Sequence, residues 1–304
     1  MRLNRLLALL GAALIVAGAC SSGGTSNKPT IKIGSDGFYE SKLVAEMYAQ
    51  VLEKAGYSVE RHLGIGARQV RVPAMESGQI DLAPEYVGSG LGYYDKTKVT
   101  GDGQKNHDAL QAIVSGKGGG LTVLDIAPGQ DSNAFVVRKD TSTTLSLTKM
   151  SQLKGVQDQL VWGLPSDCDT NPLCSGALKD GYGITYPPKQ RKALDACDTP
   201  MATALQGKAI DLAELCSTQP AIAQNGFVTL EDDNHTQPAE NMAPLVRNDY
   251  LAKVDKASFE KLLNDLSAKI TTDVLTTLGV EVAVNNKDVA VVAKDWLTAN
   301  GFLK

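Results

Sequence analysis

The alternation of short apolar runs with helical periodicity restricts the fold more than any other feature of this sequence. Residues 31–34 are strand-like, and residues 41–55 repeat apolar side chains at three- and four-residue spacing, the pattern of an amphipathic helix. Gly56 stands where a helix C-cap is expected. The alternation continues with a strand-like run over 59–63, a helix over 70–77 and a strand over 80–83. Strands and helices joined by short connections predict a parallel sheet covered by helices.

The same pattern restarts in the middle of the chain. A strand is expected over 161–164, a short helix over 201–205 and a further strand over 210–213. The segments MESGQIDLAPEY, near residue 80, and LQGKAIDLAELC, near residue 210, both read as helix, glycine, polar residues and Ile-Asp-Leu-Ala. Chance, together with the residue pattern that strand–helix units generally share, would also explain this similarity. It fits a chain of two similar α/β lobes.

Two further segments, 135–140 and 244–249, each read as an apolar strand followed by Arg and an acidic loop. In a two-lobed protein the chain crosses between the lobes twice, and we expect these segments to be the crossovers. The C-terminal segments 259–278 and 289–297 are predicted to be helical and to pack on the first lobe. These expectations give lobe 1 as residues 30–132 and 241–304, and lobe 2 as residues 133–240.

The N-terminus has the pattern of an export signal. Two arginines within the first five residues precede an apolar run over 6–16, and small residues then lead to Cys20. The apolar run is too short to be read first as a membrane span. Cys20 resembles the acylated cysteine of a bacterial lipobox, although Ala replaces the usual Leu three places before it. We therefore expect a signal peptide over 1–19, a lipid anchor on Cys20 and a polar tether over 20–29. A plain signal peptide with an incidental cysteine is the alternative.

Composition excludes some classes of partner. The 304-residue chain has a formal net charge of −4, whereas a nucleic-acid-binding protein would favour a basic face. Hydrophobic residues make up 43% of the chain and charged residues 21%, which is ordinary for a soluble globular protein. No later segment approaches the length of a membrane span. We expect contact with the membrane through the lipid anchor alone, and no nucleic-acid partner.

Four cysteines remain after Cys20, namely Cys168, Cys174, Cys197 and Cys216. An even number in an exported chain predicts disulfides, and four cysteines allow three pairings. The Pro-containing loop between Cys168 and Cys174 favours a local bridge. Cys197 and Cys216 are then left as the second pair. A four-cysteine zinc site is the alternative, although neither pair has the two-residue gap typical of structural zinc.

The residues from 31 to 91 carry a specific resemblance. They include IKIGSDGFYESKL, YAQVLEKAGY and GQIDLAPEYVGSG. Together with AIDLAELCSTQPAI, LEDDNH and MAPLVRNDYL further along, they resemble the osmoprotectant-binding proteins, which bind glycine betaine, choline and related quaternary amines. The resemblance covers nearly all of the chain after the tether. It implies a type II periplasmic-binding fold, in which two α/β lobes joined by two crossover strands close on a solute held between them.

The same resemblance implies a function. Such proteins are extracytoplasmic, need no cofactor or metal, and deliver a small compatible solute to the permease and ATPase subunits of an ABC importer. We expect a membrane-anchored monomer of this kind and no enzyme activity, because the sequence has no Gly-x-Ser-x-Gly or His-Glu-x-x-His motif and its three histidines lie far apart. A binding protein of the same fold for another small polar or aromatic ligand, and an anchored sensor module, are the alternatives.

Quaternary ammonium groups cannot donate hydrogen bonds, so they are held on the electron-rich faces of aromatic rings. The resemblance implies a cage of several rings. Tyr86 occupies its PEY position, and Ser89 stands at a polar position nearby. The other ring positions align with Asn133, Cys216 and Glu240, which are not aromatic. The cage implied by the resemblance is therefore depleted in this chain.

Phe38 and Ser41 stand at the start of the first helix, where helix N–H groups face the edge at which parallel strands end. Packing and helix capping are the alternatives for such residues. Asn171 aligns with an Arg that binds the ligand carboxylate in the family, and Glu240 in a pocket would favour a cation without a carboxylate. We therefore expect weak glycine betaine binding. The candidate ligand residues are Phe38, Ser41, Tyr86, Ser89, Asn133, Cys216 and Glu240.

Overall fold

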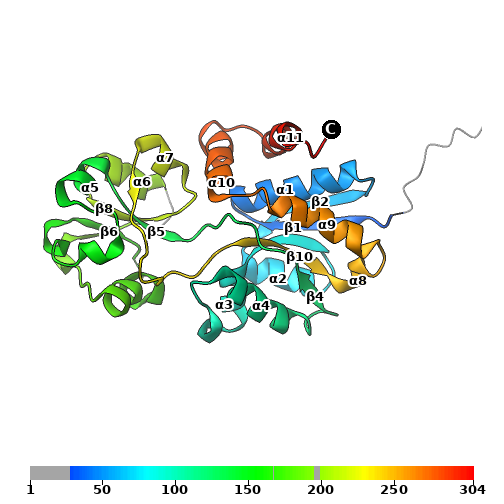
Figure 1. Cartoon of the computed structure of the whole chain (residues 1–304), viewed down its shortest axis with the longest axis horizontal. Coiled ribbons are helices and arrows are strands. Elements are labelled where there is room, and N and C mark those ends of the chain that lie inside the picture. The colour runs from blue at the N-terminus through cyan, green and yellow to red at the C-terminus, as the bar shows by residue number, and fades with distance from the viewer. Residues whose placement is uncertain (1–27, 167, 195–198) are drawn as a thin grey trace, which may run out of the picture.

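The chain folds into two α/β lobes joined by two crossover segments (Figure 1). The computed structural model describes residues 28–166, 168–194 and 199–304. Each lobe contains one five-stranded sheet. The predicted two-lobed α/β architecture is confirmed. The signal sequence, Cys20 and Cys197 lie outside the described residues.

The first sheet has the strand order β2-β1-β3-β10-β4. Its strands are β2 (Val59–Gly66), β1 (Ile31–Asp36), β3 (Leu82–Tyr86), β10 (Met242–Arg247) and β4 (Leu121–Val123). β1 runs parallel to β2 and β3, whereas β10 runs antiparallel to β3 and β4. Met242, where β10 begins, pairs with Tyr86, where β3 ends. The sheet is mixed and not purely parallel because the chain returns from the second lobe at this edge and can only run back along β3.

The second sheet repeats this arrangement with the strand order β7-β6-β8-β5-β9. Its strands are β7 (Arg191–Ala193), β6 (Trp162–Leu164), β8 (Leu212–Cys216), β5 (Asn133–Val137) and β9 (Val228–Thr229). β6 is parallel to β7 and β8, and β5 is antiparallel to β8. The first crossover enters the second sheet at Asn133, which pairs with Cys216 at the end of β8.

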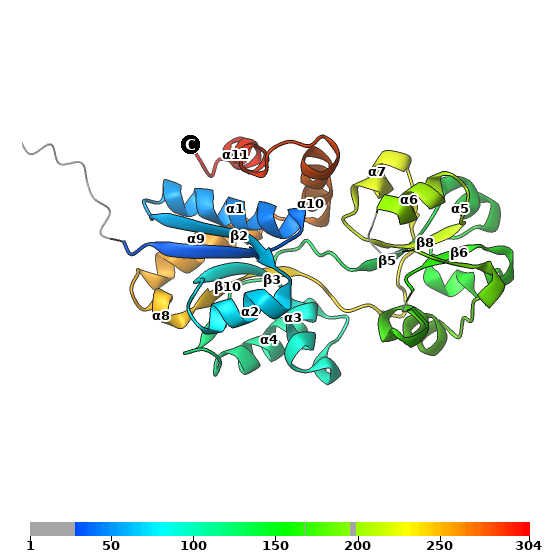
Figure 2. The same cartoon turned by 180° about the vertical axis from the view of Figure 1, so that it is seen from behind.

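Helices cover both faces of each sheet, and each covered face forms a buried apolar core. In lobe 1 the helices lie in two layers on opposite sides of the sheet (Figure 2). One layer contains α1 (Tyr39–Lys54), α9 (Lys256–Ser267), α10 (Thr272–Gly279) and α11 (Val289–Ala299). The other contains α2 (Arg68–Glu76), α3 (Val87–Tyr94) and α4 (Gly103–Val114), while α8 (Asn248–Leu251) follows β10. The α-helices described in lobe 2 are α5 (Lys139–Leu145), α6 (Thr199–Gln206) and α7 (Pro220–Asn225), and a π-helix spans Pro172–Gly181.

The two Ile-Asp-Leu-Ala segments occupy equivalent places in the two lobes. Asp81 Oδ2 accepts the backbone N–H of Lys32 at 3.0 Å, and Asp211 Oδ2 accepts that of Val161 at 2.9 Å. These carboxylates bond the beginning of the neighbouring strand. As a consequence β3 and β8 each begin at the following Leu and extend three residues beyond the strands predicted over 80–83 and 210–213.

The helical segment predicted over 259–278 is divided into α9 and α10. Thr271 caps α10, because its Oγ1 accepts the N–H of Val274 at 3.2 Å. In the turn before it, the carbonyl of Ile270 accepts the N–H of Gly129 at 2.8 Å. The break in the helix therefore ties the first crossover to lobe 1.

The two crossovers run side by side, since Gln130 and Asn241 form an antiparallel bridge. On one side of the crossovers the lobes touch, because α7 packs against α10 (Figure 1). No helix within the described ranges has the length and apolar character that a bilayer span requires.

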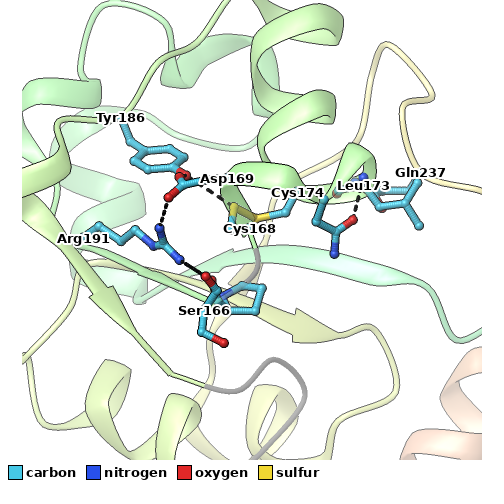
Figure 3. Close-up of a disulfide and its surroundings, with 10 residues drawn as sticks. Ser166, Cys168, Asp169, Leu173, Cys174, Tyr186, Arg191 and Gln237 are labelled. Atoms are coloured by element: carbon cyan, nitrogen blue, oxygen red, sulfur yellow. Dashed lines mark hydrogen bonds and ion pairs between the residues drawn. A yellow bond between two sulfur atoms is a disulfide. The ribbon is translucent and has the colours of Figure 1, made fainter.

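Cys168 and Cys174 form a disulfide with an S–S distance of 1.93 Å (Figure 3), which confirms the predicted local bridge. Asp169, inside this loop, accepts hydrogen bonds from the Tyr186 hydroxyl and the Arg191 guanidinium. Leu173 O accepts the side-chain amide of Gln237 at 2.8 Å. The disulfide loop is therefore held both to β7 and to the second crossover.

The double variant Cys168→Ala, Cys174→Ala tests the contribution of this bridge. Closing a loop of this length restricts the unfolded chain by about 2 kcal/mol in the loop-entropy treatment. We expect the free energy of unfolding, from urea titration of the oxidised protein, to fall by about this amount. An unchanged midpoint and slope would contradict a stabilising role. Lys261→Met on α9, which removes one exposed ion pair with Asp265, serves as the control.

Candidate functional site: a cleft between the lobes

A buried guanidinium ties together the elements that end at the cleft side of lobe 1. Arg71, in α2, is fully buried. It donates to Asp36 Oδ1 of β1 at 2.9 Å and to Glu85 Oε2 of β3 at 2.7 Å. Arg68, one helical turn earlier, donates to Glu85 Oε1 at 3.0 Å. Burial opposes ionisation of Glu85, but Arg71 and Arg68 outweigh it and lower the pKa of this carboxyl.

Glu240, from the second crossover, bonds the first turn of α3. Its Oε2 accepts the N–H of Ser89 at 2.9 Å, and its Oε1 accepts the Ser89 hydroxyl at 2.6 Å. Burial raises the pKa of Glu240 to about 7, although the bonds from Ser89 and the charge of Arg68 oppose the rise. Ser89 and Glu240, both candidate ligand residues from the sequence, are thus in direct contact.

Two aromatic rings lie at the start of α1. The centroids of Phe38 and Tyr86 are 5.9 Å apart, and the planes are inclined at 36°. Phe38 is 45% exposed, whereas Tyr86 is buried and donates its hydroxyl hydrogen to Glu40 Oε1 at 2.5 Å. Phe38 therefore presents an accessible ring face, and Tyr86 connects that ring to a buried carboxyl.

A cavity of about 520 Å³ lies between the lobes. Lobe 1 contributes Arg68, Ser89 and Tyr93 to its wall, lobe 2 contributes Asn171 and Leu173, and the second crossover contributes the segment from His235 to Glu240. A neighbouring cavity of about 450 Å³ is lined by Phe38 and shares Arg68 and Gln69 with the first. The volume is sufficient for a small organic solute.

The remaining predicted residues lie elsewhere. Ser41 is buried, and its Oγ accepts the N–H of Asp36 at 3.0 Å, so it holds the loop before α1. Asn133 lines a third cavity of about 310 Å³, which lies against the crossovers and lobe 2. Cys216, beside it, is disulfide-bonded and offers no free thiol to a ligand. Cys197, its predicted partner, lies outside the described residues.

Sequence reasoning missed two residues that line the cavity between the lobes, Arg68 and Gln237. It also missed Glu40, which bonds Tyr86, and Asp131, which lies near Glu40. Arg68 could have been found, because it begins a helix directly after a parallel strand. Gln237 lines the cleft, yet nothing in its local sequence distinguishes it from an ordinary loop residue. Glu40 and Asp131 are 91 positions apart and come together only through the crossover.

The zinc alternative fails for the first cysteine pair. Cys168, Cys174 and Glu214 are close enough in space to resemble a ligand set. The two sulfurs are joined to each other, however, and zinc binds thiolates. In the part of the chain that the structure describes, no other group of three metal-ligating side chains converges.

Residues 29–299 match the family described as the substrate binding domain of ABC-type glycine betaine transport systems. The chain belongs to this family. One relative is the glycine betaine-binding protein YehZ of Escherichia coli K12, which is 26% identical over 307 residues covering 98% of this chain and 99% of that protein. Another is the carnitine transport binding protein OpuCC of Listeria monocytogenes, 26% identical over 286 residues that cover 92% of this chain and 90% of that protein. Membership confirms the predicted solute-binding function for an ABC transporter.

Solved structures of related proteins share the fold. The crystal structure of a glycine betaine/carnitine/choline ABC transporter protein superposes with a TM-score of 0.81 at 22% identity, covering 90% of this chain and 100% of that one. Apo YehZ superposes with a TM-score of 0.78 at 24% identity, covering 90% and 99%. The two-lobed binding-protein fold of the family is therefore present in this chain.

The variant Arg71→Met tests whether the buried guanidinium holds the cleft side of lobe 1 together. Removing it leaves Asp36 and Glu85 buried with their charges partly uncompensated, a change that typically costs about 3–5 kcal/mol. We expect a loss of this size in the free energy of unfolding at pH 7. Lys261→Met, which removes one exposed helical ion pair with Asp265, should change it by less than about 1 kcal/mol. Equal effects of the two variants would contradict the assignment.

Proposed function

We propose that this chain captures a small quaternary amine outside the cytoplasm and delivers it to an ABC importer. The observation that carries the proposal is the cavity between the lobes, which has Glu240 in its wall. It shares Arg68 and Gln69 with a neighbouring cavity lined by Phe38, whose ring packs against Tyr86. Ring faces attract a quaternary ammonium, and a carboxylate supplies its countercharge. Relatives named for glycine betaine and carnitine support this class of ligand.

The charges around the cleft favour a cation that carries no carboxylate. Arg71 bonds Asp36 and Glu85, and the charge of Arg68 is engaged by Glu85. The hydrogen bonds of Glu240 come from Ser89, a neutral residue. The Glu240 carboxylate in the wall attracts a cation and repels a ligand carboxylate. Choline has the chemistry that this arrangement favours, and glycine betaine has a carboxylate that it opposes.

The proposal includes the cellular setting. Residues 1–19 act as a signal peptide, Cys20 carries a lipid anchor and residues 20–29 form the tether. The binding unit works as a monomer without catalytic activity, with lobe 1 over 30–132 and 241–304 and lobe 2 over 133–240. The family to which the chain belongs supports this reading, because its members serve as the binding domains of transport systems.

Isothermal titration of choline into the mature protein tests the ligand class. The wild type should bind choline, and Tyr86→Phe should bind it within a few-fold, because the ring is kept. Tyr86→Ala should weaken binding by at least about tenfold, because it removes the ring against which Phe38 packs, and a cation–π contact on Phe38 contributes on the order of 1–2 kcal/mol. If Tyr86→Ala folds, as judged by circular dichroism, and binds choline as the wild type does, the aromatic platform is wrong.

The anchor is tested separately by Cys20→Ser in the full-length chain expressed in a bacterium. Loss of the acylated sulfur should move the protein from the membrane fraction to the soluble extracytoplasmic fraction, or leave the signal peptide uncleaved. Mass spectrometry of the wild-type N-terminus should find lipid on Cys20. Membrane retention and acylation that persist in the variant would refute the lipoprotein assignment.

A further inference from the structure

A buried carboxyl, Glu40, and a half-buried one, Asp131, lie close together near the boundary of the lobes. Glu40 comes from the first turn of α1, and Asp131 comes from the first crossover. Tyr86 donates its hydroxyl hydrogen to Glu40 Oε1 at 2.5 Å, and the N–H of Thr218, from lobe 2, donates to Asp131 Oδ1 at 3.1 Å. Glu40 Oε2 is buried and has no hydrogen-bond partner among the residues that the structure describes. Within those residues, this oxygen is an acceptor open to a ligand.

The other buried acids of lobe 1 are compensated, and this pair is not. Asp36 and Glu85 each bond the guanidinium of Arg71. The groups that act on Glu40 and Asp131 in the described part of the chain are hydroxyls, a backbone N–H and the two carboxyls themselves. Burial and the neighbouring Asp131 raise the pKa of Glu40 to about 8. Two carboxyls this close together, with no basic partner among the described residues, oppose each other's ionisation until a cation joins them.

The pair lies beside the rings of Phe38 and Tyr86. The Tyr86 side chain reaches from the Glu40 carboxyl to the ring of Phe38, which lines one cavity. Gln130 and Ser132, on either side of Asp131, line another. A cation on the Phe38 ring would therefore lie one tyrosine side chain away from the pair.

We propose that Glu40 and Asp131 supply the countercharge for the cationic head group of the ligand and so select a cation without a carboxylate. This inference rests on the proposed uptake of a quaternary amine. The pair takes the place of the rings that are absent at Asn133, Cys216 and Glu240. Its field attracts the head group of choline and repels the carboxylate of glycine betaine, so it acts on the ratio of the two affinities.

Isothermal titration of choline and glycine betaine into Glu40→Gln and Asp131→Asn tests the inference. Each amide keeps an oxygen that can accept the native hydrogen bond, so both variants retain the partners Tyr86 and Thr218. At pH 9, where Glu40 is ionised, removing one charge that acts on the cation across the Tyr86 side chain should weaken choline binding by roughly tenfold. Glycine betaine should be unchanged or bind more tightly, so the choline-to-betaine affinity ratio falls. Asp265→Asn, on the exposed face of α9, is the matched control.

A pH series adds a readout that a purely structural role would not move. Choline affinity of the wild type should rise as the pH passes through about 8, because Glu40 loses its proton there, and Glu40→Gln should lack this rise. The groups that face the pair are Tyr39, Tyr86, Ser217 and Thr218, and none of them is basic.

Folded variants that keep both the wild-type choline-to-betaine affinity ratio and the rise of choline affinity with pH would overturn the inference while leaving quaternary amine binding intact. A loss in Glu240→Gln alone would assign the countercharge to Glu240 and also overturn it. A wild type that binds neither ligand would instead refute the proposed function.

Discussion

The contact of Arg71 with Asp36 and Glu85 is the constraint on which the cleft depends. It joins the carboxyl ends of β1 and β3 to α2 inside the protein, where a single unpaired charge would be strongly destabilising. Glu85 Oε1 in turn accepts the N–H of Tyr86 at 2.9 Å. The position of the aromatic residue is thus set by the same carboxylate that neutralises the guanidinium. On this side of lobe 1 the charges of Arg68 and Arg71 are paired with those of Asp36 and Glu85. Glu40 and Asp131 differ, because no basic side chain in the described residues is paired with them.

Much of the fold could be predicted because local periodicity encodes it. The alternation of strands and helices, and the repeated Ile-Asp-Leu-Ala segments, indicated two similar lobes before their sheets were known. Periodicity does not encode strand direction, so the antiparallel insertion of β5 and β10 could not be read from it. Side-chain bonds also decided local boundaries, as Asp81 and Asp211 did for the strands that follow them.

The sequence suggests candidate site residues where one residue type points to one chemistry, and it gives no signal where two distant residues must come together. Tyr86 was recognised from its motif, and Ser89 and Glu240 were both named, although their bond across 151 positions could not be foreseen. Glu40 was overlooked because an acid in the first turn of a helix ordinarily stabilises the helix dipole. Its burial against Asp131 depends on the path of the crossover, which no local pattern records.

The central claim is that the cleft between the lobes, with Glu240 in its wall and the Phe38–Tyr86 ring pair beside it, holds a quaternary ammonium ion. The most direct measurement is native mass spectrometry of the mature protein purified gently from its own periplasmic or surface fraction, followed by identification of the ligand released on denaturation. The account predicts a small quaternary ammonium cation without a carboxylate, released in a ratio near one per chain. A neutral or anionic solute released in that ratio would contradict it.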